Sequence, residues 1–389
     1  MITLALAGKP NCGKTTFFRA ATMAHAEIAN YPFTTIDANF GVAYFRAECP
    51  CRNLSLPCKK CVDGARFIPV NMIDVAGLVP DAHKGRGLGN QFLDNLRQAD
   101  AIIHIVDASG ATDSEGNPVE TGSHNPLDDI AFLRYEMNMW VYGILDKHWA
   151  RLQRQAQTRT YSVHTGVAEV FAGLGISPED VRDAEVSAAI DLVHADEDGL
   201  KSFCREIVEI SKPMIAIGNK VDQAPAGLLA TLEQSGMIFA SAAGELALRN
   251  AANAGMVTYL PGDPTFSINK TDELSQAQKA GLEKIAAVMN RFGGTGVQQA
   301  INHTVRELLG LIVVYPVEDE NKFSDSRGEV LPDAFLMKKG STPRDLAYQV
   351  HTDIGKGFLY AIDARTKMRV KDTHVLSDGD IVRIVSTAK

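Results

Sequence analysis

Short apolar runs alternate with longer mixed segments along much of the chain. Mostly apolar runs lie at positions 2–7, 39–45, 66–73, 215–219 and 237–240. Runs of this length are typical of strands that are buried in a sheet, and the segments between them are long enough for helices. The alternation therefore predicts an α/β fold, with a mostly parallel sheet and helices on both of its faces.

The middle of the chain is too long for a single connecting helix. Apolar side chains recur there at helical spacing, at Ile130, Leu133, Met137, Val141 and Ile144. We expect an inserted helical domain or a coiled-coil hairpin over residues 127–205, in which the Met and Trp side chains serve packing. Residues 272–309 are also predicted to be helical, with a break at the glycines of 293–296.

The C-terminal segment contains a turn and a final strand, in the sequence VLSDGDIVRIV, as expected of a β-grasp fold. We expect three domains. Residues 1–126 and 206–311 form the main α/β domain, with a cysteine-rich insertion at 47–64. Residues 127–205 form the helical domain, and residues 312–389 form the β-grasp domain.

Composition and charge narrow the class of protein. Of the 389 residues, 45% are hydrophobic and 22% are charged, and the net charge of −8 argues against a uniformly basic nucleic-acid binder. No apolar run approaches the roughly 20 residues of a membrane helix, and the N-terminus reads as a first strand, not a signal peptide. We therefore expect a cytoplasmic monomer with no membrane partner.

A glycine-rich turn follows the first apolar run. Its sequence GKPNCGKTT has the spacing G-x-x-x-x-G-K-[ST], in which glycines let successive N–H groups point at phosphate oxygens. Lys14 adds a positive charge, the Thr15 hydroxyl can bind Mg²⁺, and the following helix points its positive end at the same anion. The predicted nucleotide-binding residues are Gly8, Pro10, Asn11, Cys12, Gly13, Lys14, Thr15 and Thr16. The alternative is a glycine-rich turn without a ligand.

Two further segments fit a nucleotide whose γ-phosphate is sensed. Asp74 and Gly77 form D-x-x-G after a predicted strand, so the carboxylate can hold Mg²⁺ and the Gly77 N–H can face the γ-phosphate. The loop NYPFTT carries Thr34 and Thr35, and we assign the Mg²⁺ ligand to Thr35. A threonine that caps a turn is the alternative.

The end of the run at 215–219 predicts which base is bound. Asn219, Lys220 and Asp222 form N-K-x-D, in which the carboxylate can accept two hydrogen bonds from guanine, whereas adenine offers no such pair of donors. The Lys220 stem can lie along the base, and Asn219 can tie this loop to the glycine-rich turn. A backbone N–H at Ser241 or Ala242 can meet the guanine oxygen. The motifs together predict a GTP-binding domain.

The segments GKPNCGKTTFF, NYPFTT, DVAGLVPDAHKGRGLGNQFL and NKVD resemble those of the Obg-type GTPases, and most closely the YchF subfamily in its archaeal form. The likeness is sharp over about half of the chain. It implies a P-loop GTPase domain, a C-terminal TGS domain, which is a small β-grasp module, from about residue 312, and a translation-associated GTP hydrolase. The expected partners are GTP and GDP, and the ribosome or RNA through the TGS and helical domains. Many YchF proteins have Glu in place of the final Asp of N-K-x-D and favour ATP, but Asp222 keeps the guanine-reading form.

The hydrolytic residues are less clearly marked. Leu78 stands where Ras-like enzymes have a water-positioning Gln, so another group orients the water or turnover is slow. The resemblance suggests K⁺ bound by Asn11, or His83 near the γ-phosphate, although His83 can equally be a solvated loop residue. The predicted catalytic residues are Lys14, Thr35, Gly77, His83 and Asn11. Gly85, Gly87 and Gly89 suggest a second switch that moves.

Four cysteines lie between two predicted strands, in the sequence CPCRNLSLPCKKC. Cys49, Cys51, Cys58 and Cys61 can complete a tetrahedral Zn²⁺ site, which would be structural. Disulfides, which the cytosol disfavours, and free thiols are the alternatives. Cys204 fits a helix core.

The β-grasp segment contains 12 Lys and Arg residues and 12 Asp and Glu residues, so it has no net charge. Strand alternation predicts one shared face for Arg365, Lys367, Arg369 and Lys371. Such a face suits RNA phosphates, although a solvated strand face explains it equally well. Two rival functions stay open: a scaffold that holds nucleotide without turnover, and an ATPase or small-molecule kinase.

Overall fold

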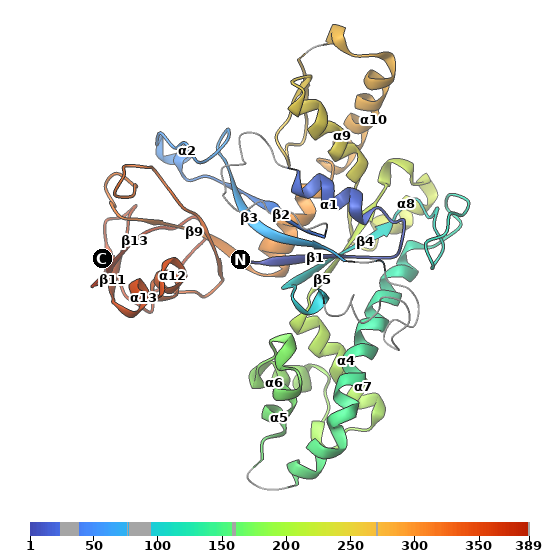
Figure 1. Ribbon diagram of the computed structural model, residues 1–389, viewed down its shortest axis with the longest axis vertical. Helices are drawn as coiled ribbons and strands as arrows, with labels where there is room; N and C mark the ends of the chain where they lie inside the picture. The colour runs from blue at the N-terminus through green and yellow to red at the C-terminus, as the bar shows by residue number, and fades with distance from the viewer. Residues whose placement is uncertain (24–38, 76, 78–94, 158–160, 270, 388–389) are drawn as a thin grey trace. The chain divides into compact units, whose positions relative to one another are not determined.

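A computed structural model describes residues 1–23, 39–75, 77, 95–157, 161–269 and 271–387 (Figure 1). These residues separate into two compact units. Unit 1 holds residues 1–23 and 39–43 and the described part of Asn71–Ala300, and unit 2 holds Tyr44–Val70 and the chain from Ile301 onward. This division differs from the three predicted domains, because a segment from the first fifth of the chain packs with the C-terminal part.

A six-stranded sheet forms the centre of unit 1, and two of its strands continue into unit 2. The strands are β1 (Thr3–Ala7), β2 (Phe40–Glu48), β3 (Ala65–Asp74), β4 (Ala101–Asp107), β5 (Met214–Asn219) and β6 (Ile238–Ala240). Their order is β2-β3-β1-β4-β5-β6, and the neighbours from β3 to β6 pair in parallel. Every residue of β4 is buried, as expected of a central parallel strand. The predicted α/β fold is confirmed.

Helices cover both faces of this sheet. They include α1 (Lys14–Thr22), α8 (Ala226–Glu233), α9 (Ala242–Asn253), α10 (Gln276–Phe292) and α11 (Val297–His303), which continues as a π-helix over Thr304–Leu308. Figure 1 shows α1 and α9 on one side of the sheet, and α4 (Pro126–Ala156) leaving from the other. A two-stranded sheet of β7 (Val257–Thr258) and β8 (Ser267–Ile268) lies between α9 and α10 in the chain.

The middle of the chain is helical, as predicted. It contains α4, α5 (Val163–Val170), α6 (Pro178–Ser187) and α7 (Glu197–Ser211), which pack together in unit 1 (Figure 1). Leu133, Met137 and Val141 of α4 share one buried core with Phe203 and Ile207 of α7. The domain boundary predicted at residue 205 therefore falls inside α7, because the apolar face of that helix continues to pack against α4 beyond this point.

The C-terminal part of unit 2 is a mixed five-stranded sheet with two short helices. Its elements are β9 (Leu311–Val317), β10 (Phe335–Lys338), α12 (Pro343–Val350), α13 (Thr352–Lys356), β11 (Phe358–Asp363), β12 (Arg369–Val370) and β13 (Ile381–Ser386). The order is β10-β9-β13-β11-β12, with β9 and β13 parallel and the other pairs antiparallel. The predicted β-grasp module is confirmed. Among the described helices of both units, none has the length and apolar character that crossing a membrane requires.

The four basic residues predicted to share the face of one strand do not lie on one strand, which corrects that prediction. They are Arg365, Lys367, Arg369 and Lys371. Only Arg369 belongs to β12, whereas residues 364–366 form a turn that Asp363 stabilises by accepting hydrogen bonds from two backbone N–H groups. The guanidinium carbon of Arg369 stacks 3.9 Å from the ring centre of Tyr360. Strand alternation fails here because the turn interrupts the strand.

Candidate nucleotide-binding site

The glycine-rich turn connects β1 to α1, as the motif requires. Gly8 has φ 146°, and a Cβ there would lie 2.3 Å from the carbonyl oxygen of Ile105. Gly13 has φ 98°, and its Cβ would lie 2.2 Å from Nδ2 of Asn219. Both positions thus exclude side chains for two reasons, backbone conformation and space. The backbone of Asn11 is also in the left-handed region, with φ 61°, a conformation that asparagine tolerates better than most residues.

Lys14 begins α1 and points back across the turn. Its Nζ donates to the carbonyl oxygens of Gly8 and Lys9, at 2.9 and 2.8 Å. The side chain is buried, and its charge is held against the backbone of the turn by these two acceptors. This arrangement places a fixed positive charge in an anion-binding loop at a helix N-terminus.

The two described residues predicted to bind Mg²⁺ meet in the structure. The Thr15 hydroxyl donates to Oδ2 of Asp74 at 2.9 Å, although the two residues are 59 positions apart. Burial raises the pKa of Asp74 above its ordinary value, while the Thr15 hydrogen bond and the charge of Lys14 lower it. A hydroxyl and a carboxylate are the oxygen ligands that Mg²⁺ takes in such sites, so this pair fits the ion.

The D-x-x-G segment reaches the same turn. A Cβ on Gly77 would lie 3.0 Å from three atoms of Pro10, so only glycine allows this approach without a shift of the turn. The remaining predicted switch residues lie outside the described residues: Thr34, Thr35, Leu78, His83, Gly85, Gly87 and Gly89. Their assigned roles stay predictions.

Asn219 joins the predicted base-reading loop to the glycine-rich turn. It ends β5, its Nδ2 donates to the carbonyl oxygen of Cys12 at 3.0 Å, and its Oδ1 accepts from the Ala242 N–H at 3.0 Å. The Ser241 N–H donates to the carbonyl oxygen of Thr295 at 2.9 Å. Both N–H groups that were predicted to face guanine therefore already donate hydrogen bonds within the protein. For either of them to meet the guanine oxygen, it would have to exchange this partner for the base.

Lys220 crosses the loop in a left-handed conformation, with φ 61°. Its Nζ donates to the carbonyl oxygen of Asn11 at 2.7 Å and to Oδ2 of Asp107 at 2.8 Å. The next turn of chain, Val221–Gln223, is a short 3-10 helix that leaves Asp222 exposed. Asp222 is therefore exposed two positions after a lysine whose ammonium group has two acceptors, and its role in reading the base stays a prediction.

Asp107 holds this loop, and the sequence reasoning missed it. It ends β4, is fully buried, and accepts hydrogen bonds from the N–H and hydroxyl of Ser109, the hydroxyl of Thr112 and Nζ of Lys220. Burial alone would raise the pKa of Asp107, but the hydrogen bonds from Lys220 and Ser109 bring it below its ordinary value. The available signal was a carboxylate directly after an apolar strand, the same pattern that marked Asp74.

The segment after β4 also folds onto the glycine-rich turn. A Cβ on Gly116 would lie 2.5 Å from the carbonyl oxygen of Pro10, and Nδ2 of Asn11 donates to the Gly116 carbonyl oxygen at 3.0 Å. Lys9 anchors the base of this segment, through the Thr112 carbonyl oxygen and an ion pair with Asp129, both at 2.8 Å. Sequence patterns gave no sign of this contact, because no motif marks the segment around Gly116.

Comparisons with known proteins agree with this geometry. Residues 3–131 match the family model of the 50S ribosome-binding GTPases, residues 217–319 match the G4 motif-containing domain of YGR210-like Obg-like GTPases, and residues 328–386 match the TGS domain. A GTP-binding protein of Methanocaldococcus jannaschii is 47% identical over 398 residues, which cover 100% of both chains. The ribosome-binding ATPase YchF of Bacillus subtilis is 27% identical over 369 residues, covering 92% of this chain and 87% of its own.

The chain belongs to the Obg-like GTPases of the YchF type. A solved structure supports the assignment over the whole length of this YchF-type GTPase. The crystal structure of a GTP-binding protein from Pyrococcus horikoshii OT3 is 41% identical, covers 99% of this chain and 100% of its own, and superimposes with a TM-score of 0.77. The resemblance found from the motifs is confirmed.

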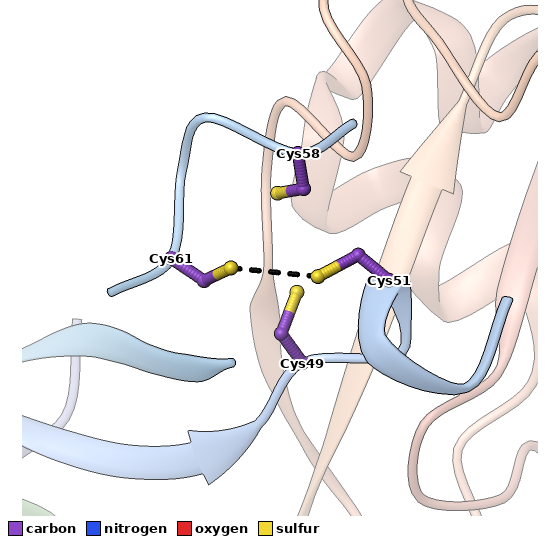
Figure 2. A group of neighbouring side chains, drawn as sticks. All are labelled: Cys49, Cys51, Cys58 and Cys61. Atoms are coloured by element: carbon purple, nitrogen blue, oxygen red, sulfur yellow. Dashed lines mark hydrogen bonds between the residues drawn. The ribbon is translucent and has the colours of Figure 1, made fainter. Parts of the chain in front are cut away.

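The YchF-type GTPase also carries the four cysteines as one cluster, in unit 2. Cys49 follows β2, Cys51 begins the short helix α2 (Cys51–Leu54), and Cys58 and Cys61 lie in the turn before β3. Figure 2 shows their side chains pointing toward one another. All four are unbridged, so disulfides, one of the two alternatives to a metal site, do not form in this structure.

Proposed function

We propose that this YchF-type GTPase binds GTP and hydrolyses it to GDP and phosphate, as a switch that acts on the ribosome or RNA. The observation that carries the proposal is the convergence of three motifs on one turn. Asn219 and Lys220 hold the N-K-x-D loop to the carbonyl oxygens of Cys12 and Asn11, while Thr15 and Asp74 meet at 2.9 Å. This convergence supports one nucleotide site with phosphate-binding, metal-binding and base-binding parts.

Guanine specificity is the part of this proposal that nucleotide competition tests. We expect GTP to bind roughly 100-fold more tightly than ATP, because two hydrogen bonds to a carboxylate are worth about 3 kcal/mol or more. Displacement calorimetry against bound GDP measures the ratio. Lys14→Ala is the control, since it should weaken both triphosphates without changing their ratio. Tighter binding of ATP would instead place the chain with its Bacillus subtilis relative, which is named an ATPase.

The metals that we expect follow from the ligands. Mg²⁺ would be held by Thr15, Asp74 and, in the triphosphate state, Thr35, and it would neutralise charge on the phosphates. The four-cysteine cluster would hold a structural Zn²⁺.

Turnover should depend on the monovalent cation. A K⁺ ion bound by Asn11 would supply the positive charge that an arginine finger supplies elsewhere, and Leu78 removes the Gln that usually positions water. We expect GTP turnover to be at least about 10-fold faster in KCl than in NaCl of equal ionic strength. Phosphate release measured in the two salts gives the answer. Equal rates would remove K⁺ from the mechanism and leave His83 as the candidate.

The ribosome is the partner that we propose, in the cytoplasm, through the TGS and helical domains. The family model matched by residues 3–131 and the name of the Bacillus subtilis relative both support this choice. Co-sedimentation with ribosomes in the presence of GDP, and of a non-hydrolysable GTP analogue, tests it. Ribosomes that bind the protein without raising its turnover would favour the rival function, a nucleotide-dependent binding module.

A further inference from the structure

The sulfur atoms of the four-cysteine cluster have the spacing of a zinc tetrahedron. The Sγ atoms of Cys49, Cys51, Cys58 and Cys61 all lie within 4.8 Å of one another, and those of Cys51 and Cys61 are 3.4 Å apart (Figure 2). Zn–S bonds of about 2.3 Å place the sulfurs of a regular tetrahedron ~3.8 Å apart. A disulfide would need about 2.05 Å between two sulfurs, and it would leave the other pair unexplained.

The backbone around the cluster is built to present thiolates. The Lys60 N–H donates to Sγ of Cys58 at 3.4 Å, a contact that favours a charged sulfur and fixes its direction. Ser55, in a left-handed conformation, ends α2, and the Leu56 N–H donates to the carbonyl oxygen of Cys51. Cys49 and Cys51 are buried whereas Cys58 and Cys61 are half-buried, so an ion has a route into the site from one side.

A buried positive charge lies where it can offset the charge of such a site. Arg66 is 1% exposed, its charge acts on Cys58, and its Nη1 has no hydrogen-bond partner among the residues that the structure describes. Binding of Zn²⁺ by four thiols releases four protons to solvent and leaves a complex with net charge −2. The positive charge of the guanidinium therefore stabilises the zinc-bound cluster. Without zinc the four thiols are neutral, so the buried charge of Arg66 is only partly compensated.

The residues next to these cysteines also hold the C-terminal module, within unit 2. The hydroxyl of Tyr315, a fully buried residue of β9, donates to the carbonyl oxygen of Glu48 at 3.4 Å. Nη2 of Arg66 donates to the carbonyl oxygen of Pro332 at 3.0 Å, and Nζ of Lys60 pairs with Glu329 at 2.7 Å. Each of these hairpin residues lies within five positions of a cysteine of the cluster, so the shape of the cysteine loop sets where these contacts form.

We propose that the four cysteines bind one Zn²⁺, and that this ion holds the tip of the β2–β3 hairpin in the shape that anchors β9 and residues 329–332. Four thiolates leave no open coordination position, so the site is structural. The helix α2 is the one helix or strand within residues 49–64, so we expect binding of the ion to contribute much of the order of this loop. The inference rests on the proposed zinc site, but not on GTP hydrolysis.

Metal analysis of the full-length chain, purified in reductant, tests the occupancy. We expect one zinc per chain, and at least a tenfold fall in Cys58→Ser and Cys61→Ser. Cys204→Ala is the matched control, a buried cysteine of α7 that should keep the metal. Wild-type protein stripped with a chelator gives the same comparison if the variants fail to fold. Metal-free wild-type protein, or iron in place of zinc, would overturn the site.

Hydrogen exchange tests the anchoring role on the same samples. Loss of zinc should speed exchange at least tenfold in Tyr44–Val70 and in β9, while β4 and β5 exchange as before. Unchanged exchange in β9 would overturn the anchoring role. GDP affinity, measured in parallel, separates this inference from the proposed function. A chain that holds zinc but binds no nucleotide would contradict only the proposed function. A wild-type chain that binds nucleotide but holds no metal would contradict only the zinc site.

Discussion

Replacing Asp222 by asparagine should lower the affinity for GTP about 100-fold and create measurable affinity for xanthosine triphosphate. In the proposed site the carboxylate would accept from both the ring N–H and the exocyclic amine of guanine, whereas an asparagine amide offers one acceptor and one donor. Its N–H would face the amine of guanine, a mismatch that costs roughly 3 kcal/mol when the lost hydrogen bond is counted. Xanthine has a carbonyl oxygen at that position, which accepts from the new N–H.

Displacement of a fluorescent GDP analogue by each triphosphate measures both affinities. Gln223→Ala provides the matched control, because Gln223 is the next residue of the same 3-10 helix and is also exposed. It should change GTP affinity less than twofold. An Asp222→Asn variant that binds GTP as tightly as the wild type would show that another residue reads the base.

Sequence motifs located the parts of the site whose chemistry is local. The glycine-rich turn, the Asp74 carboxylate and the N-K-x-D loop each follow an apolar strand, and parallel strands deliver such residues to one edge of a sheet. The structure brings Thr15 to Asp74 and Asn219 to Cys12, as this rule requires. The helical middle was likewise visible, because periodicity is a local signal, whereas the β-grasp module was predicted from the family resemblance and from its last turn and strand.

Contacts between distant segments that no motif marks were not visible in the sequence. Two examples are the close approach of Gly116 to Pro10 and the hydrogen bond from the Tyr315 hydroxyl to the Glu48 carbonyl oxygen. Each joins residues more than 100 positions apart, and no local pattern encodes such a pairing. The face predicted for the basic residues near Arg369 failed for the opposite reason. Strand alternation is a local rule that holds only within a strand, and here a turn that Asp363 stabilises interrupts the strand.

Replacing Asp107 by alanine should cost about 3–5 kcal/mol of stability and weaken GDP binding. The substitution leaves the ammonium of Lys220 and the hydroxyls of Ser109 and Thr112 without their shared acceptor in a buried site. Lys220 then loses one of the two contacts that fix it over the glycine-rich turn. Urea unfolding with and without GDP measures both effects. Glu115→Ala, an exposed carboxylate on the segment that follows, should leave the unfolding midpoint unchanged.

The pH dependence of this loss identifies its cause. Because the folded protein lowers the pKa of Asp107, its contribution is complete above the ordinary aspartate value of about 3.9 and disappears as the pH falls through the lower folded value. The stability difference between wild type and Asp107→Ala should therefore be constant from pH 5 to pH 7 and shrink below about pH 4. Asp107→Asn keeps the shape and two of the acceptor contacts, so it should lose less. A difference that stays constant down to pH 3 would mean that packing, and not the charge of Asp107, holds the base-reading loop to the glycine-rich turn.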